Sequence, residues 1–218
     1  MSERVLELRR AWEDRERRLG STEQAVLFKR FPRWLNHRIH RRHVDFILRN
    51  LPPHTRRLLD VGCGYGRISR EVKRRFPAIA FQGIDLCPGF AAAYSREIGP
   101  CFAGPVQDFR SDGSYDAILI VTLLMYLDAA EHAPMLRRLW SLLAPGGRLL
   151  CIEPAIEMVR WWRRIMGRAS ASPTGGSIHH FSRPELEELL GGLEGGTLRE
   201  ATAIELVPLI PGTALHYA

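Results

Sequence analysis

Residues 58 to 69 read LLDVGCGYGRIS, and this stretch decides the fold. A strand-like run ends at Asp60, and Gly62, Gly64 and Gly66 then alternate with other residues before a helix-like segment. Glycine lets a backbone turn tightly and approach a ligand closely. A dinucleotide loop needs G-x-G-x-x-G and a Walker loop needs Gly-Lys-Ser/Thr, and neither pattern is present. The ligand at this turn therefore need not carry phosphates.

Strand-like and helix-like segments alternate on both sides of this turn, which predicts a parallel sheet covered by helices on both faces. In such a sheet the ligand crevice lies at the carboxyl ends of the strands, so the glycine turn should form its floor. The expected strands are residues 57–62, 78–85, 101–106, 115–121, 147–153, 197–209 and 213–218. The expected helices are residues 67–76, 88–99, 129–144, 157–168 and 183–193.

The first 54 residues have a different character. Residues 3–19 and 33–51 predict two charged helices, and the first carries only a thin apolar stripe that includes Val5, Leu8 and Trp12. We expect residues 1–54 to form a helical cover and residues 55–218 to form the core. Residues 155–180 would be a lid or insertion within a single structural domain.

The bulk composition is ordinary for a globular protein, with 218 residues, 45% hydrophobic and 25% charged. No apolar run reaches the roughly 18 residues that a membrane span requires, and the charged N-terminus has no signal core. We therefore expect a cytoplasmic location and no transmembrane segment. The four cysteines form no C-x-x-C pair, and His37, His40 and His43 drift around a helix, so no metal site is expected.

The positive charge is concentrated at the N-terminus. Residues 1–50 hold 13 lysines and arginines against 7 acidic residues, whereas the remaining 168 residues hold 18 against 17. Such a segment attracts nucleic acid, anionic lipid or an acidic carrier protein, or it is simply a solvated helix face. Composition alone leaves these alternatives open.

Polar residues follow the second and third strands at positions suited to a nucleoside. Asp85 ends the second strand 19 residues after Gly66, where a carboxylate can accept hydrogen bonds from both ribose hydroxyls. Gln107 and Asp108 follow the third strand, where an adenine amino group could be recognised. The sequence therefore predicts a nucleoside-bearing ligand over the glycine turn.

In this order and spacing, the segments LLDVGCGYGRIS, GIDL, VQDF, YDAILIVTLLMYL and LLAPGGRLLCIEP resemble the class I S-adenosylmethionine (SAM)-dependent methyltransferase family. They cover about residues 56 to 154, and IHHFSRPELEELL is a looser match. The resemblance implies a Rossmann-like, doubly wound seven-stranded α/β sheet with strand order 3-2-1-4-5-7-6 and strand 7 antiparallel, here with an N-terminal helical extension. It also implies SAM as cofactor and S-adenosylhomocysteine (SAH) as product.

The resemblance also assigns cofactor contacts to positions of this chain. Those near the methionine part of SAM are Asp60, Gly62, Cys63, Gly64, Gly66, Ile120 and Val121. Those near the ribose and adenine are Asp85, Leu86, Gln107, Asp108 and Phe109.

Methyl transfer from a sulfonium is an in-line displacement in which positioning can supply much of the rate. A base is needed only where the nucleophile arrives protonated. The candidates for catalytic or substrate-side roles are His179, His180, Tyr126 and Glu153, and for each a purely structural role is the alternative.

A compact core without an appended recognition module favours a small-molecule substrate methylated on oxygen or nitrogen. The alternative is a macromolecular or carrier-bound substrate (protein, RNA or an acyl-carrier-linked intermediate) docked on the basic N-terminal helices. No N/D-P-P-Y tetrad follows the fourth strand, which disfavours nucleobase amino groups, and no stable nucleic-acid complex is expected. A protein that binds SAM without catalysis is a further alternative. The sequence predicts no particular oligomeric state.

Overall fold

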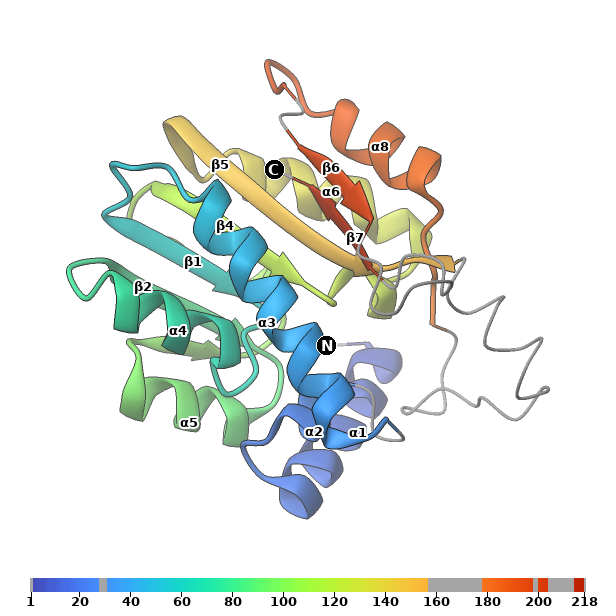
Figure 1. Ribbon diagram of the computed structural model, residues 1–218. Helices are drawn as coiled ribbons and strands as arrows, with labels where there is room; N and C mark the ends of the chain where they lie inside the picture. The colour runs from blue at the N-terminus through green and yellow to red at the C-terminus, as the bar shows by residue number, and fades with distance from the viewer. Residues whose placement is uncertain (1, 28–30, 157–177, 198–199, 204–213, 218) are drawn as a thin grey trace.

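The computed structural model describes residues 2–27, 31–156, 178–197, 200–203 and 214–217. Its sheet has the strand order β3-β2-β1-β4-β5-β7-β6 (Figure 1). The pairs from β3 to β5 are parallel, and β7 pairs antiparallel with both β5 and β6. The strands are β1 Arg57–Val61, β2 Ala80–Asp85, β3 Cys101–Ala103, β4 Tyr115–Val121, β5 Leu143–Pro154, β6 Ala201–Ala203 and β7 Ala214–Tyr217.

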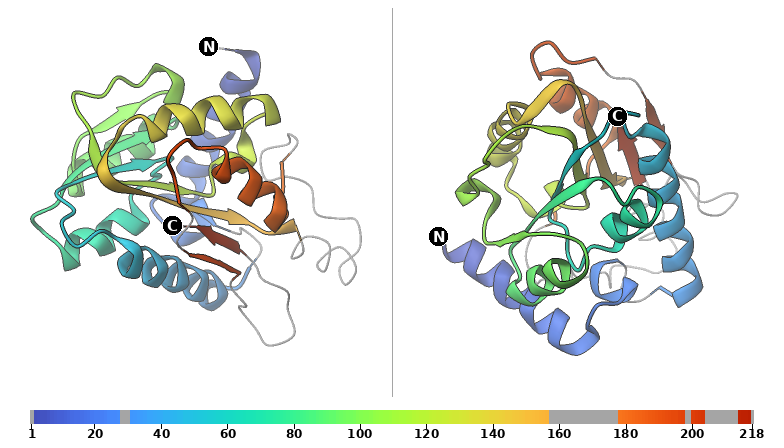
Figure 2. Two further views of the ribbon diagram at one scale, coloured as in Figure 1. Left: turned by 90° about the horizontal axis from the view of Figure 1, so that it is seen from above. Right: turned by 90° about the vertical axis from the view of Figure 1, so that its left-hand side faces the viewer.

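Helices cover both faces of this sheet, and Figure 2 shows α3 and α6 on opposite sides of it. The helices are α1 Glu3–Leu19, α2 Glu23–Val26, α3 Arg33–Asn50, α4 Arg67–Arg75, α5 Pro88–Glu97, α6 Ala129–Trp140 and α8 Arg183–Gly191, with short 3-10 helices η1 Val106–Asp108 and η2 Leu124–Tyr126. The expected α/β, Rossmann-like class is confirmed by the five parallel strands.

Strand β4 has apolar side chains on both of its faces, because each face packs in a separate core. Ile118 and Ile120 pack in a core with α6 and α8, whereas Leu119 and Val121 pack in a second core with α3 and α4. Successive side chains of a strand point to opposite faces, so a strand covered on both sides reads as a continuous apolar run. That is why residues 115–121 predicted a buried parallel strand.

The start of β5 differs from expectation. Residues 143–146 were expected to end a helix and form a turn, but β5 already begins at Leu143, which pairs with Tyr115. The register shifts between Tyr115 and Ala117, and Gly146 has φ of 75°. A bulge therefore lets the strand absorb a glycine-rich segment that resembles a turn in sequence.

The N-terminal helices are observed where they were expected. Ser2 caps α1 by accepting a hydrogen bond from the Val5 N–H, and Gly20, with φ of 59°, ends it. Trp12 and Leu19 of α1 pack on a cluster with Phe90 of α5, which places α1 beside the core rather than in solvent. Within the described residues no helix combines the length and apolar character needed to cross a bilayer. The helix expected at residues 157–168 lies outside the described residues, as does most of the expected lid.

Candidate active site

The glycine turn after β1 adopts the left-handed backbone that its sequence predicts. Gly62, Gly64 and Gly66 have φ of 70°, 54° and 83°. A Cβ on Gly62 would lie 3.1 Å from Leu123 Cδ1, and one on Gly64 would lie 3.1 Å from Val26 Cγ1. A Cβ on Gly66 would lie 1.9 Å from Ile98 Cδ1, inside the packed start of α4. A Cβ at Gly62 or Gly64 would therefore crowd a side chain of the cavity wall, and one at Gly66 would overlap Ile98.

A cavity opens above this turn, at the carboxyl ends of the parallel strands. Six of the expected cofactor residues line it together: Gly62, Gly64, Asp85, Leu86, Gln107 and Val121. The remainder of its wall is mostly apolar and comes from residues that the sequence reading had not assigned to the cofactor: Val5, Leu8, Trp12, Val26, Val61, Ile84, Phe90, Gly104, Pro105, Val106, Thr122, Leu123, Tyr126 and Leu127.

Asp85 is held in place by backbone donors at the end of β2. Its Oδ2 accepts a hydrogen bond from the Gly64 N–H at 2.7 Å, and its Oδ1 accepts one from the Cys87 N–H at 2.8 Å. Burial raises the pKa of the Asp85 carboxyl to about 6, against the opposing effect of these two donors. The carboxylate thus links the glycine turn to β2 while still lining the cavity.

Asp60 has a different position from Asp85, because it does not line the cavity. It is buried, and its Oδ2 accepts a hydrogen bond from the Ser69 hydroxyl of α4 at 2.6 Å. Burial raises the pKa of the Asp60 carboxyl to about 6. Its contact to α4 fixes the helix that begins at the glycine turn.

The other expected cofactor residues also lie outside the cavity lining. Cys63 is buried with its Sγ 3.5 Å from Cys101 Sγ, and Phe109 and Ile120 pack in the core below the site. Asp108 is exposed on η1, one residue beyond Gln107. Adjacent positions on a strand or turn point in different directions, so a contiguous sequence motif supplies only some of its side chains to a cavity.

The loop after β4 forms one wall of the cavity, and Glu153 of β5 accepts hydrogen bonds from its backbone. Oε1 of the fully buried Glu153 accepts hydrogen bonds from the N–H groups of Leu123 at 2.8 Å and Leu124 at 2.7 Å. Its Oε2 is buried and has no hydrogen-bond partner among the described residues. Burial raises the pKa of the Glu153 carboxyl to about 8. Thr122 adopts φ of 55° in this loop, a conformation that L residues rarely adopt.

Helix α1 contacts the same loop through an aromatic pair, a hydrogen bond and an ion pair. The rings of Trp12 and Tyr126 meet edge to face with centroids 5.4 Å apart. Arg4 donates a hydrogen bond to the Tyr126 carbonyl at 3.0 Å and forms an ion pair with Asp128. The apolar stripe of α1, visible in sequence, thus supplies part of the cavity wall: Val5, Leu8 and Trp12.

The chain matches a known protein family. The model of the family described as "Methyltransferase domain" matches residues 35–193, about three quarters of the chain. The chain belongs to this family. The recognition of a class I SAM-dependent methyltransferase from its sequence motifs is confirmed.

Curated relatives of this methyltransferase domain match over part of their length. A trans-aconitate 2-methyltransferase of Methylobacterium nodulans is 30% identical over 119 residues, covering 54% of this chain and 45% of the relative. A demethylmenaquinone methyltransferase of Thermus thermophilus is 31% identical over 120 residues, covering 52% of each protein. The chain thus spans about half of the length of these two relatives.

Solved structures share the fold over nearly the whole chain. Magnesium protoporphyrin IX methyltransferase from Synechocystis, crystallised with SAH, aligns with a TM-score of 0.69, 16% identity and 99% coverage of both chains. The N-methyltransferase NodS from Bradyrhizobium japonicum, also with SAH, aligns with a TM-score of 0.66, 17% identity and coverage of 95% and 96%. At these identities the likeness shows the shared fold.

The two histidines expected on the substrate side of this methyltransferase domain do not line the cavity. His179 Nε2 lies 2.6 Å from Glu185 Oε1, and its ring packs against Phe181 with centroids 4.5 Å apart. The His179 N–H also donates to the Met125 carbonyl at 3.0 Å, just behind η2. His180 is half-buried beside it. Both precede α8, and the segment before them lies outside the described residues.

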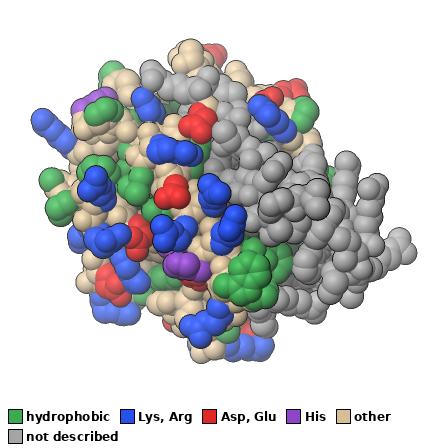
Figure 3. Space-filling model, in the orientation of Figure 1, with side chains coloured by type: hydrophobic (Ala, Val, Ile, Leu, Met, Phe, Trp, Pro, Cys, Tyr) green, Lys and Arg blue, Asp and Glu red, His purple; other side chains and the backbone are tan. Residues whose placement is uncertain are grey.

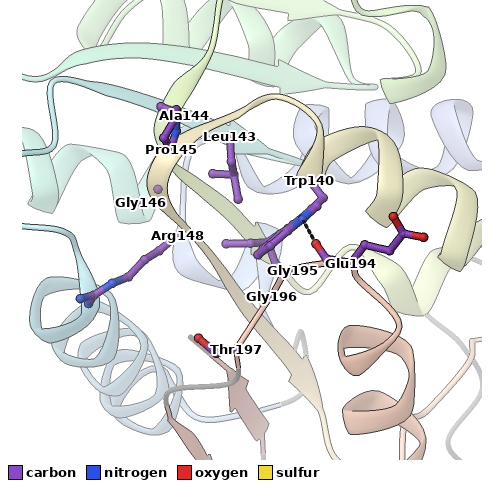
Figure 4. A pocket seen from close by; sticks show the side chains of 12 residues that line it. Trp140, Leu143, Ala144, Pro145, Gly146, Arg148, Glu194, Gly195, Gly196 and Thr197 are labelled. Atoms are coloured by element: carbon purple, nitrogen blue, oxygen red, sulfur yellow. Dashed lines mark hydrogen bonds between the residues drawn. The ribbon is translucent and has the colours of Figure 1, made fainter.

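A second hollow lies at the opposite edge of the sheet, at the amino end of β5 (Figure 4). It is lined by the β5 bulge and by the loop after α8, where Trp140 Nε1 donates to the Glu194 carbonyl at 3.1 Å. None of the expected site residues lines it. In open α/β sheets ligands bind at the carboxyl ends of the strands, so the cavity over the glycine turn is the candidate site.

His40 and His43 of α3 both face the guanidinium of Arg67. Arg67 Nη1 lies 3.4 Å from His40 Nδ1, and Arg67 Nη2 lies 3.0 Å from His43 Nδ1. A guanidinium supplies only donors, so it pairs with imidazole nitrogens that act as acceptors. In the part of the chain that the structure describes, no group of three or more His, Cys, Asp or Glu side chains is arranged to hold a metal ion.

Proposed function

We propose that this methyltransferase domain binds SAM in the cavity over the glycine turn and transfers its methyl group to an oxygen or nitrogen of a small molecule. The observation that carries the proposal is the convergence of six expected cofactor residues on one cavity, with Asp85 oriented by two backbone donors. SAM is a nucleoside that carries a methionine-derived sulfonium group. Such a ligand requires backbone space, a carboxylate for its ribose and an apolar wall, and the cavity offers all three.

Each of the six expected cofactor residues in the lining has a proposed role toward the cofactor. Gly62 and Gly64 leave space for the methionine part, and Asp85 accepts hydrogen bonds from the ribose hydroxyls. Leu86 and Gln107 contact the adenine, the first by apolar packing and the second through its amide. Val121 contributes its backbone at the amino-acid end. When bound, the cofactor supplies a methyl group activated by a positively charged sulfur.

The expected residues outside the lining act by supporting those inside it. Asp60 holds α4 through Ser69, and Gly66 lets that helix start close to α5. Cys63, Phe109 and Ile120 pack beneath the site. Asp108 reaches the adenine only if η1 adjusts when the cofactor binds.

We further propose that residues 1–54 act as a helical cover over a core formed by residues 55–218. The cover is supported by Val5, Leu8 and Trp12 in the cavity wall and by the Arg4 contacts to the loop after β4. A cover of this kind excludes water from the reacting centre, and it must open to exchange cofactor. The proposed lid at residues 155–180 lies largely outside the described residues.

Positioning rather than proton transfer is the proposed source of catalysis. Burial raises the pKa of the Tyr126 hydroxyl to about 12, so it stays protonated and acts as a wall or hydrogen-bond donor. Glu153 shapes the loop that carries Tyr126. If a base is needed, His179 and His180 remain the proposed candidates.

A small-molecule acceptor is supported by the names of the relatives, which methylate trans-aconitate or demethylmenaquinone. The test incubates the enzyme with methyl-labelled SAM and an extract of its source cells, then separates protein, nucleic acid and small molecules. Label in small molecules supports the proposal, and label in protein or RNA replaces it with a macromolecular substrate. Calorimetry with SAH tests the cofactor assignment separately, because Asp85→Ala must weaken binding.

A further inference from the structure

The outer face of α3 carries a row of exposed side chains at helical spacing. We call it the arginine face and define it as Arg33, Trp34, Arg38, Arg41, Arg42 and Arg49, all of which are exposed. Residues three, four and seven apart share one side of a helix, so Trp34, Arg38, Arg41, Arg42 and Arg49 lie along one stripe. Arg33 flanks its N-terminal end, and the whole face is about 24 Å long. Figure 3 shows Lys and Arg side chains gathered over this side of the molecule.

The positive charge of the arginine face is largely unneutralised. In the described part of the chain no ion pair involves Arg33, Arg38, Arg41 or Arg42, and Arg49 reaches Glu200 only at 4.0 Å. Asp45 is the one acidic residue among the exposed positions of α3. By contrast, the exposed basic residues at the end of α1 share Asp14, with Arg18 Nη2 at 2.9 Å.

Trp34 gives this face an apolar anchor. Its side chain is 64% exposed, whereas most large apolar side chains in the described chain are buried or half-buried. It borders a surface hollow that is also lined by three arginines, one histidine and one acidic residue: Arg38, Arg41, Arg42, His37 and Asp45. Tryptophan and arginine are the residues most enriched where protein partners bind tightly, because both offer large contact areas and directed hydrogen bonds.

The packing and the side chains of α3 favour one kind of anionic partner over a membrane or a nucleic acid. A helix that lies on a membrane must insert its apolar face, but the apolar face of α3 is already packed in the protein core through Val44, Phe46 and Ile47. Single-stranded nucleic acid is bound by successive aromatic side chains along a groove, whereas α3 exposes only Trp34, its other large aromatic residue, Phe46, being buried. Arginine forks match carboxylates through paired hydrogen bonds.

We propose that the arginine face docks an acidic surface of a partner protein, with Trp34 as its central anchor. The partner would sit next to the candidate active site. His37 Nδ1 on α3 lies 3.1 Å from Glu23 Oε1 on α2, and Val26 of α2 lines the cavity. The proposal stands independently of the reaction, because it concerns a surface on which none of the cavity residues lies.

The test uses the full chain and a fluorescein-labelled acidic peptide of roughly 16 residues, the length that spans about 24 Å as a helix. The peptide carries glutamates at helical spacing and a leucine to meet Trp34. Binding is followed by anisotropy for the wild type, for Arg38→Ser/Arg41→Ser/Arg42→Ser and for Trp34→Ala. The matched control, Arg74→Ser/Arg75→Ser/Arg96→Ser, removes the same charge from other exposed positions.

We expect the arginine-face triple variant to bind the peptide at least about tenfold more weakly and Trp34→Ala about threefold more weakly, with the control unchanged. Equal losses in both triple variants would mean non-specific attraction and would overturn the proposal. So would binding of a uridine oligonucleotide or of phosphatidylserine vesicles that is tighter than peptide binding and is lost in the arginine-face variant. SAH affinity should be the same in all four proteins, which shows that each is folded.

Discussion

The Trp12 ring meets the Tyr126 ring edge to face at a centroid distance of 5.4 Å, although the two residues are more than 100 positions apart. This contact joins the N-terminal helix to the loop that follows β4, and both residues line the candidate cofactor cavity. Part of the cavity wall thus comes from a segment that precedes the residues matched by the family model.

Trp12→Ala should weaken SAH binding. Aromatic pairs contribute about 0.5 to 1.5 kcal/mol beyond their buried area, which corresponds to roughly two- to twelvefold in affinity. Dissociation should become faster because the cover is held less firmly. Stopped-flow and calorimetry measure both effects, and Trp34→Ala is the control because that ring lies away from the cavity. An unchanged dissociation rate in Trp12→Ala would contradict the role of α1 as a cover.

Asp85→Asn should lower SAH affinity by about ten- to a hundredfold, because hydrogen bonds to a charged group contribute about 1.5 to 3 kcal/mol. The side chain keeps its size, but its amide can accept only one of the two backbone hydrogen bonds, so thermal unfolding of the variant is measured beside its affinity. Asp112→Asn is a suitable control, since its exposed carboxylate pairs with Arg57 away from the cavity. Calorimetry at neutral pH measures the SAH affinity of both variants. Equal affinities would show that Asp85 does not contact the cofactor.

SAH affinity of the wild type should fall as the pH drops through about 6. The pKa of the Asp85 carboxyl in the folded protein is raised to about 6 by burial, and the ribose contact requires the ionised form. Below this pH, binding must displace a proton and is therefore weakened. Titrations in buffers from about pH 5 to 8 measure the effect. The Asp85→Asn variant should show a flatter profile, and a persistent drop there would point to Asp60 instead.

Glu153 should make the protein less stable as the pH rises. The pKa of its carboxyl is raised from the usual 4.5 to about 8, so the folded state binds more protons than the unfolded state between these values. The free energy of unfolding then decreases with rising pH across that window. Glu153→Gln should reduce the dependence by on the order of 1 to 3 kcal/mol, as measured by urea unfolding at about pH 6 and about pH 8.5.

Glu153→Ala tests whether the hydrogen bonds that Glu153 accepts hold the loop after β4 in place. It leaves the Leu123 and Leu124 N–H groups without their acceptor, which costs about 1 to 3 kcal/mol for each buried donor that water cannot reach. SAH affinity should fall with it, because the cavity wall loosens, whereas Glu153→Gln should retain affinity through its amide oxygen. Equal SAH affinities for Ala and Gln would show that the loop does not depend on this contact.

Gly66→Ala should destabilise the protein much more than Gly146→Ala. Both glycines have positive φ, at 83° and 75°, so each substitution pays a conformational cost of about 1 to 2 kcal/mol. At Gly66 the new methyl group would also overlap Ile98 Cδ1, whereas nothing lies within 4 Å at Gly146. Overpacking adds about 1 to 3 kcal/mol at the first site. Thermal unfolding of both variants measures the difference.

The sequence predicted the strands and helices of the core because their signals are local. The continuous apolar run at residues 115–121 and the amphipathic run at residues 67–75 depend only on neighbouring residues, and both elements formed as expected. The β5 start was mispredicted because the bulge at Leu143 depends on pairing with Tyr115. A turn-like sequence can join a strand when a neighbouring strand supplies its hydrogen bonds.

By itself the sequence determined the α/β class, the glycine turn and the placement of Asp85 at the end of β2, since glycine spacing and strand ends are properties of a short stretch. Only the tertiary structure decided which of the motif residues line the cavity, because neighbouring side chains on a strand point to opposite faces. It also decided that Glu153 lies beneath the loop after β4 and that Trp12 lines the cavity. Those contacts join segments that are far apart in the chain, and their proximity is set by how the sheet orders its strands.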